Sequence, residues 1–153
     1  MEMNKLNWKW GETSPLCVQT STGHIKAGDL LWLNNDGTCW SHRDFMKVGK
    51  GFTEYDVRCL FSACFVGVAM QSSMQCGKSI RVATSGTFDF PADEDIGKSA
   101  IIGDHYGPSF DDDGRLTRSL EHVSTEESVG RIGHTLDVPA GHVYIRIKGH
   151  KTD

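Results

Sequence analysis

The sequence predicts an all-β fold, a small β-barrel or sandwich built from two similar β-meander units, with an extended N-terminal arm and little helix. Three observations lead to this prediction. Seventeen glycines separate short runs of apolar residues. Two of these runs, within 79–90 and 143–147, alternate between apolar and polar residues with the period of two that is typical of a strand. Helix signals are scarce, and the best of them, 121–128, is too short and too polar to be convincing.

The first half of the chain predicts a hairpin and then a buried strand. Residues 30–33 are apolar, and 34–37 (Asn-Asn-Asp-Gly) then supply residues that tolerate the positive φ angles of a tight turn, before the pattern resumes at 38–40. A one-turn helix near 53–60 is the most helix that we expect here. Residues 61–70 are nearly all apolar or small, which is typical of a strand that is buried on both faces.

The remaining elements continue in the same style. Residues 79–90 predict one alternating strand, in which we expect Phe88 and Phe90 to lie in the core. The further candidates are, in order, an apolar segment at 100–102, an Asp-Gly turn leading into 115–117, strands at 128–136 and 143–147, and a turn between them at 137–141.

Four short matches occur in the same order in both halves of the chain and indicate an internal repeat. They pair Gly28 with Gly97, Asp36-Gly37 with Asp113-Gly114, Val66-Gly67 with Val129-Gly130, and 77–82 with 141–147. We therefore predict an N-terminal arm, residues 1–22, and a single β-domain, residues 23–150. The domain contains copies at about 28–83 and 97–148, and an insertion at about 41–58 lies in the first copy.

Length, charge and cysteine content exclude several classes of protein. The 153 residues suit one domain, and the net charge of −4 argues against nucleic-acid binding, which uses a basic surface. No apolar stretch is long enough to span a membrane, and we expect no secretory signal after Met1. The five cysteines are odd in number and contain no Cys-x-x-Cys pair, so we expect reduced thiols and no disulfide.

The sequence carries no signature of an enzyme or of a metal site. The seven histidines show no ligand spacing of a known metal motif. Residues 111–114 (Asp-Asp-Asp-Gly) resemble part of a calcium loop, but the acidic residues do not alternate and the twelfth position is His122, so we expect a hairpin turn. Gly-x-Ser-x-Gly is absent. We predict that the protein is not an enzyme and uses no metal or cofactor.

Two aromatic segments are candidate contact surfaces. Trp8 and Trp10 share one face at strand spacing, with Lys9 opposite, and either cover the domain's own barrel or dock on a partner. The insertion carries four aromatic residues among basic residues that include Arg43, which would suit an acidic partner surface. These aromatic residues are Trp40, Phe45, Phe52 and Tyr55.

Several segments together resemble the tailed-phage capsid decoration proteins, also called head-stabilising or cement proteins. The resemblance covers about residues 12–148. The residues that carry it are Gly23–Leu30, Val66–Ala69, Ile80–Phe90, Asp113–Thr117 and Gly141–Ile147.

The resemblance implies a protein of the virion, made in the host cytoplasm, which binds the major capsid protein on the outside of an icosahedral head as a homotrimer and stabilises the expanded shell. Trp8, Lys9, Trp10, Trp40, Arg43 and Phe45 would then contact the capsid or a neighbouring subunit. Three alternatives stay open. They are another phage structural role, such as a head-fibre base or tail, a sugar-binding β-sandwich that uses Trp32, Trp40 and Tyr106, and a small enzyme.

Overall fold

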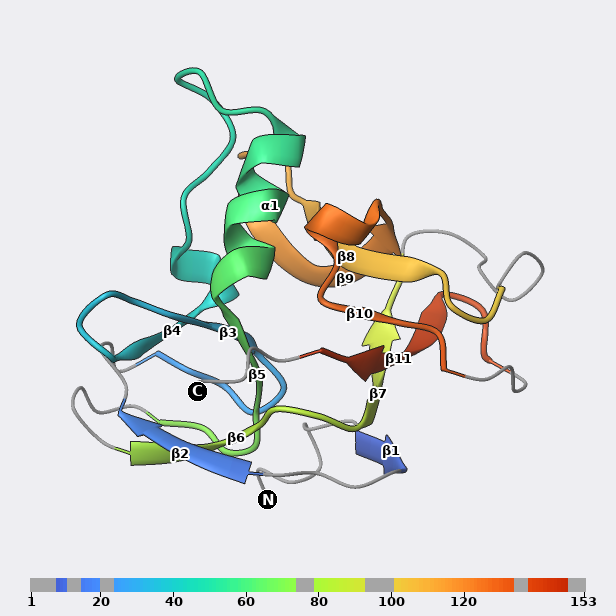
Figure 1. Ribbon diagram of the computed structural model, residues 1–153, viewed down its shortest axis with the longest axis horizontal. Coiled ribbons are helices and arrows are strands. Elements are labelled where there is room, and N and C mark those ends of the chain that lie inside the picture. Colours follow the sequence, from blue (N-terminus) through green and yellow to red (C-terminus); the bar gives the residue numbers. More distant parts are fainter. Residues whose placement is uncertain are drawn as a thin grey trace.

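A computed structural model describes residues 8–10, 15–19, 24–73, 79–92, 101–133 and 138–148. Two antiparallel sheets make up most of these residues, with one α-helix and short 3-10 turns, so the predicted all-β barrel or sandwich is confirmed (Figure 1). Both described parts of the predicted N-terminal arm belong to the sheets, because each adds an edge strand to one of them.

The five-stranded sheet consists, in spatial order, of β2 (Pro15–Gln19), β6 (Ser79–Ala83), β5 (Phe65–Ala69), β3 (Leu30–Leu33) and β4 (Cys39–Ser41). The six-stranded sheet consists of β1 (Trp8–Trp10), β7 (Thr87–Pro91), β11 (His142–Ile147), β10 (Gly130–Arg131), β8 (His105–Phe110) and β9 (Leu116–His122). This second sheet curls into part of a barrel, because Ala92, just after β7, forms an isolated parallel bridge with Leu120 of β9.

The internal repeat is present as a repeated strand order. The sequence β6-β5-β3-β4 in one sheet corresponds to β11-β10-β8-β9 in the other, and each series contains the same hairpin followed by two further strands. The predicted turns after Asn34 and Asp111 both occupy their hairpins, where the N–H groups of Gly37 and Gly114 donate to the carbonyls of those residues at 3.0 Å.

Backbone hydrogen bonds also place the start of the second copy. Gly28 donates its N–H to the carbonyl of Ala69 at 2.8 Å, and Gly103 donates to the carbonyl of Ile132 at the same distance. Both glycines have positive φ angles, +93° and +94°, and both lie two residues before the first strand of their copy. The counterpart of Gly28 is therefore Gly103 and not the predicted Gly97, which lies outside the described residues.

The helix α1 (Glu54–Cys64) is longer than the predicted single turn, and it replaces the first four residues of the strand expected at 61–70. Thr53 begins the helix with a capping box, in which its hydroxyl accepts from the N–H of Asp56 and the Asp56 carboxylate accepts from the N–H of Thr53. Val57 and Phe61, one turn apart, are the buried side chains. No helix of the described segments is long and apolar enough to cross a membrane.

The single strand expected at 79–90 is two strands in different sheets. The chain leaves β6 of the five-stranded sheet after Ala83 and enters β7 of the six-stranded sheet at Thr87. Gly86 lies between them with φ +117°, a conformation that interrupts an extended run and that glycine adopts without a steric penalty. The alternation seen in the sequence is correct within each strand, but this turn sends the two strands to different sheets.

The main hydrophobic core lies between the sheets and beneath α1. Its members come from both sheets and from the helix, and they include the expected core residues Phe88 and Phe90, which are fully buried. A second cluster, which contains Ile25, Leu31 and Val66, is formed by residues of the five-stranded sheet and the turns beside it. All five residues of β5 are buried, as predicted for a strand with two covered faces.

Candidate functional site

The predicted contact residues of the N-terminal segment lie in β1. This strand is the edge of the six-stranded sheet and pairs with β7, with Trp8 opposite Phe88 and Trp10 opposite Thr87. The side chains of Trp8, Lys9 and Trp10 lie outside the described part of the structure. The backbone pairing shows that this segment is built into the domain.

The predicted contact residue Phe45 is a core residue, which corrects the expectation that it faces a partner. Its side chain is 9% exposed, and its ring lies edge-on to Trp32 and Phe61 at centroid distances of 5.0 and 5.2 Å. Trp40 is half-buried and stacks on Trp32 at 5.8 Å. Trp40 and Phe45, two of the three contact residues predicted for the insertion, therefore belong to an aromatic cluster with residues of β3 and α1.

Arg43, the third predicted contact residue of the insertion, forms an ion pair with the buried Asp29. Its guanidinium group binds both carboxylate oxygens of Asp29 at 2.9 and 2.7 Å. Asp29 is 3% exposed and also accepts from the N–H of Lys26 at 2.9 Å and from the Ser41 hydroxyl at 3.1 Å. This bidentate geometry, the strongest form of an arginine–carboxylate pair, holds the base of the insertion against the turn before β3.

His42 adjoins the same network and is 4% exposed. Its Nδ1 atom accepts a hydrogen bond from the N–H of Leu30 at 3.3 Å, so the neutral ring carries its proton on Nε2. Burial lowers the pKa of His42 to about 4, and although the Asp29 carboxylate opposes this effect, Arg43 adds to it. His42 is therefore neutral at pH 7.

This buried histidine predicts an acid-sensitive fold. Between pH 6.5 and about 4 the unfolded chain binds a proton at His42 and the folded chain does not, so stability falls as pH falls through this window. The pKa difference corresponds to about 3 kcal/mol. Urea unfolding at several pH values should show that the free energy of unfolding falls less between pH 7 and pH 4 in His42→Asn, by about this amount. The amide oxygen of the asparagine replaces Nδ1 as acceptor. A wild-type pH dependence in His42→Asn would refute the assignment.

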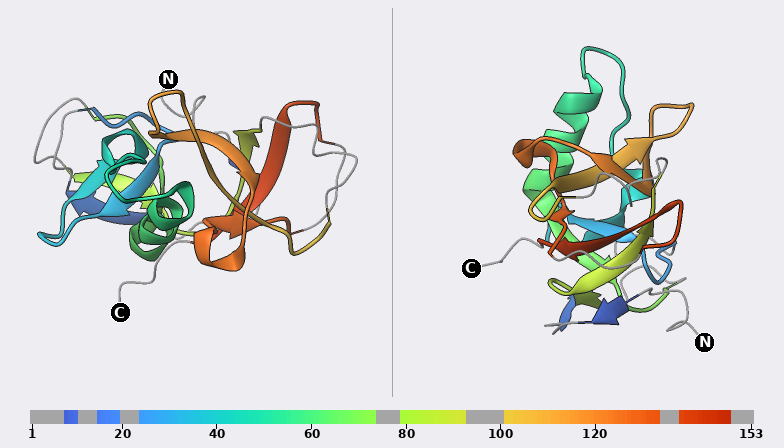
Figure 2. Two further views of the ribbon diagram at one scale, coloured as in Figure 1. Left: turned by 90° about the horizontal axis from the view of Figure 1, so that it is seen from above. Right: turned by 90° about the vertical axis from the view of Figure 1, so that its right-hand side faces the viewer.

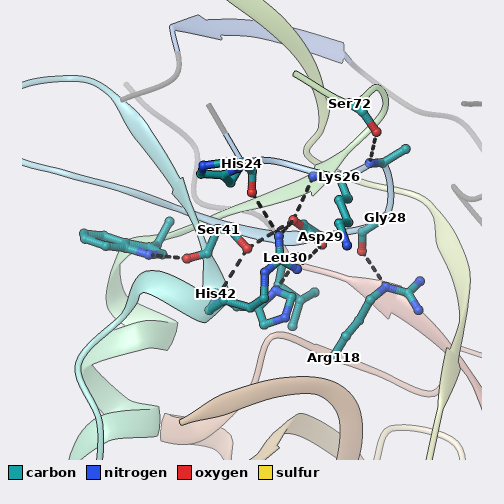
Figure 3. A network of polar contacts seen from close by, with 12 residues as sticks. His24, Lys26, Gly28, Asp29, Leu30, Ser41, His42, Ser72 and Arg118 are labelled. Carbon is teal, nitrogen blue, oxygen red and sulfur yellow. Dashed lines mark hydrogen bonds and ion pairs between the residues drawn. The ribbon is translucent and has the colours of Figure 1, made fainter. Parts of the chain in front are cut away.

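A second arginine, Arg118 of β9, connects the two sheets across this network. Its Nε atom donates to the carbonyl of Gly28 (Figure 3). Its guanidinium group lies over the Phe90 ring at 4.9 Å. Gly28 precedes β3 of the five-stranded sheet, and Phe90 lies on β7 of the six-stranded sheet. The Arg118 side chain therefore contacts both sheets. The network thus joins the two sheets.

The exposed apolar residues of the insertion lie beyond this junction, in the projecting segment, residues 46–60. This segment includes the first two turns of α1, and its tip projects at one end of the molecule (Figures 1 and 2). Four of its large apolar side chains are substantially exposed, namely Met46 (37%), Phe52 (42%), Tyr55 (50%) and Leu60 (45%). Phe52 and Tyr55 belong to the aromatic surface predicted for the insertion, although the contact residues predicted there were Trp40, Arg43 and Phe45.

A tight two-residue hairpin forms the tip of the projecting segment. The N–H of Gly49 donates to the carbonyl of Phe52 at 2.9 Å, and the reverse bond is 3.1 Å long. Lys50 and Gly51, between them, have φ angles of +54° and +90°, the pattern of a type I′ turn. Because this turn has a defined geometry, it presents Phe52 from a fixed backbone.

The base of the projecting segment is fixed to the six-stranded sheet. Val48 donates its N–H to the carbonyl of Gly114 in the β8–β9 turn at 2.9 Å. Arg58 of α1 forms ion pairs with Glu121 of β9 and with Glu127, and its Nε–Glu127 distance is 2.6 Å. Burial alone would raise the pKa of Glu127, but hydrogen bonds from Arg58 and Ser124 outweigh it and lower the pKa. The pair is therefore charged at neutral pH.

The aromatic residues proposed for sugar stacking do not form an exposed platform. Tyr106 is 3% exposed, and Trp32 is half-buried against Trp40 and Phe45.

Asp111 forms the predicted hairpin turn, with its carboxylate accepting from the N–H groups of Asp113 and Arg115 at 2.9 and 3.0 Å. Among the residues that the structure describes, no group of three or more His, Cys, Asp or Glu side chains is placed to hold a metal ion.

Comparison with known proteins adds no family to this description. No protein-family model matches the chain, and a search of curated proteins finds no match.

Proposed function

We propose that the chain is a non-enzymatic capsid decoration protein that binds the major capsid protein on the outside of an icosahedral phage head. In this proposal it is a homotrimer of the virion and stabilises the expanded shell. The resemblance of its sequence segments to decoration proteins suggests the role, and the projecting segment is the structural observation that supports it best.

The support from the projecting segment is physical. Large apolar side chains that are exposed together on a soluble protein mark surfaces for protein contact, and aromatic residues dominate the energy of such contacts. Phe52 lies on a hairpin with defined geometry, and Tyr55 lies on the first turn of the capped helix α1. A rigid display of this kind loses little conformational entropy when it binds.

The arrangement also suits a stabilising role. A protein that binds only the expanded state of a shell shifts the equilibrium toward that state. A trimer would use three projecting segments at once, so that a weak contact of each copy becomes a strong attachment.

Sedimentation with heads tests the proposal. The purified chain should sediment alone as a trimer, and it should co-sediment with expanded but not with unexpanded phage heads. Replacing both Phe52 and Tyr55 by serine should weaken binding at least tenfold, because both side chains would lie in the contact. The urea midpoint should stay close to that of the wild type, since both side chains are exposed.

Ile101→Ser provides the matched control. Ile101 is 65% exposed but belongs to the turn before β8, outside the projecting segment, so this variant should bind like the wild type. A wild-type chain that stays in the supernatant with both kinds of head would refute the decoration role. Undiminished binding by the double variant would refute the role of the projecting segment.

A further inference from the structure

A basic cleft lies on the six-stranded sheet, and none of its lining residues belongs to the projecting segment. It encloses about 630 Å³. Four of its lining residues are basic, namely His105, Arg131, Arg146 and Lys148. Four others carry hydroxyl groups, namely Thr84, Ser85, Thr125 and Ser128, and the lining is completed by Gly130 and Ile147. The lining includes no carboxylate, although the whole chain has a net charge of −4.

The sheet register places three of the basic residues in one row. Arg131 of β10 is paired directly with His105 of β8 on one side and with Arg146 of β11 on the other. Side chains of directly paired residues lie on the same face of a sheet. Lys148 follows β11 two residues after Arg146, at the spacing that returns a side chain to the same face of an extended chain.

This row differs from two other arginine sites of the molecule. Arg43 and Arg58 each bind a carboxylate within the protein. No such partner is found for Arg131, Arg146 or Lys148 among the described residues, and both arginines are exposed. Like charges directly opposite each other on paired strands are destabilising. A bound anion would relieve this repulsion.

The surroundings of the row are ordered. The Ser128 hydroxyl bonds to Nδ1 of His105 at 2.9 Å and to the Gly130 carbonyl at 2.8 Å, which holds the histidine ring beside the arginines. A Cβ atom at Gly133 would lie 3.7 Å from Cβ and Cδ of Arg146, so the Arg146 side chain runs close past the Gly133 backbone. A hydrogen bond therefore orients His105, and Arg146 lies against the Gly133 backbone.

We propose that this cleft is a binding site for the phosphate group of a compact phosphate ester. Two guanidinium groups supply the forked donors that match phosphate oxygens, while Lys148 adds a point charge. The volume is within the range of small-molecule sites and exceeds what one inorganic phosphate fills. An extended polyanion such as duplex DNA would be repelled by the acidic remainder of the chain, so the site favours a small ligand. This inference is independent of the capsid role.

Titration calorimetry on the full chain tests the site. We expect glucose 6-phosphate to bind more tightly than inorganic phosphate, and glucose to show no binding. Arg131→Gln and Arg146→Gln should each raise the Kd for glucose 6-phosphate about tenfold, because each removes a charged pair of hydrogen bonds. Arg115→Gln is the control, since Arg115 is exposed in the β8–β9 turn outside the cleft, and its Kd should equal that of the wild type.

A thermal unfolding measurement without ligand provides a second readout. Removing one of two opposed like charges should raise the Tm of Arg131→Gln by about 1–3 °C. A fall in Tm would show that the arginines serve the fold and would overturn the proposal. The absence of heat with both phosphates, unchanged binding in both arginine variants, or tighter binding of a DNA duplex than of glucose 6-phosphate would overturn it as well.

Discussion

Replacing Gly67 by alanine is expected to lower the free energy of unfolding by about 4 kcal/mol or more, at the upper end of single-residue effects. A Cβ atom at this position on β5 would lie 2.0 Å from the carbonyl oxygen of Ala83 on the neighbouring strand β6. The clash is with backbone, so no side-chain rotation relieves it, and the two strands must separate. Urea unfolding measures the loss.

Two further glycines make this prediction specific. Gly130 occupies the corresponding position of β10, where a Cβ atom would lie 2.5 Å from the carbonyl oxygen of Arg146. Gly130→Ala should therefore be strongly destabilised too, and it provides a second test if Gly67→Ala does not fold. At Gly133 the same atom would meet only ordinary contacts at 3.7 Å, so Gly133→Ala should change stability by about 0.5 kcal/mol or less. Equal midpoints for the Gly67 and Gly133 variants would contradict the close approach of the strands.

The second large effect is expected at Phe88. This side chain is fully buried on β7, with the Phe90 ring 6.4 Å away and the buried Ile145 paired opposite. Phe88→Ala removes most of a buried ring and leaves a cavity, which costs about 3–5 kcal/mol. For a chain of this size the Tm should fall by roughly 10 °C.

Phe52→Ala is the matched control for this experiment. The same atoms are removed from a side chain that is 42% exposed at the tip of the projecting segment, so the loss should be less than about 1 kcal/mol. Comparable losses in the two variants would contradict the placement of Phe88 in the core. The pair also separates stability from binding, because Phe52 is the residue that the proposed capsid contact uses.

The repeat could be predicted from sequence because the glycine at each corresponding position serves the same steric need. Gly67 and Gly130 both allow the next strand to approach, and hairpin turns require Asp-Gly in both copies.

The helix boundary was harder to predict. The short apolar run that begins at Phe61 fits a buried strand as well as one helix face, and the capping box at Thr53 favours the helix.

The candidate contact residues show where sequence reasoning reached its limit. The insertion was predicted to be a surface because it combines aromatic and basic residues. Arg43 instead pairs with Asp29, fourteen residues earlier, and Phe45 packs against Trp32 and Phe61. A sequence shows neither partner, since these contacts arise only when strands and helix are assembled. The residues left exposed, such as Phe52, are those that the core does not bury.

The sequence by itself determined the all-β class, the positions of most strands and turns and the two related halves, because local alternation and turn chemistry specify these features over a few residues. The tertiary structure alone decided which strands belong to which sheet, which side chains of the insertion are buried, and which charges meet. The row of His105, Arg131 and Arg146 is an example, because the three residues lie far apart in the chain and strand register brings them together. Burial and electrostatic pairing depend on long-range contacts, and these exist only in the folded chain.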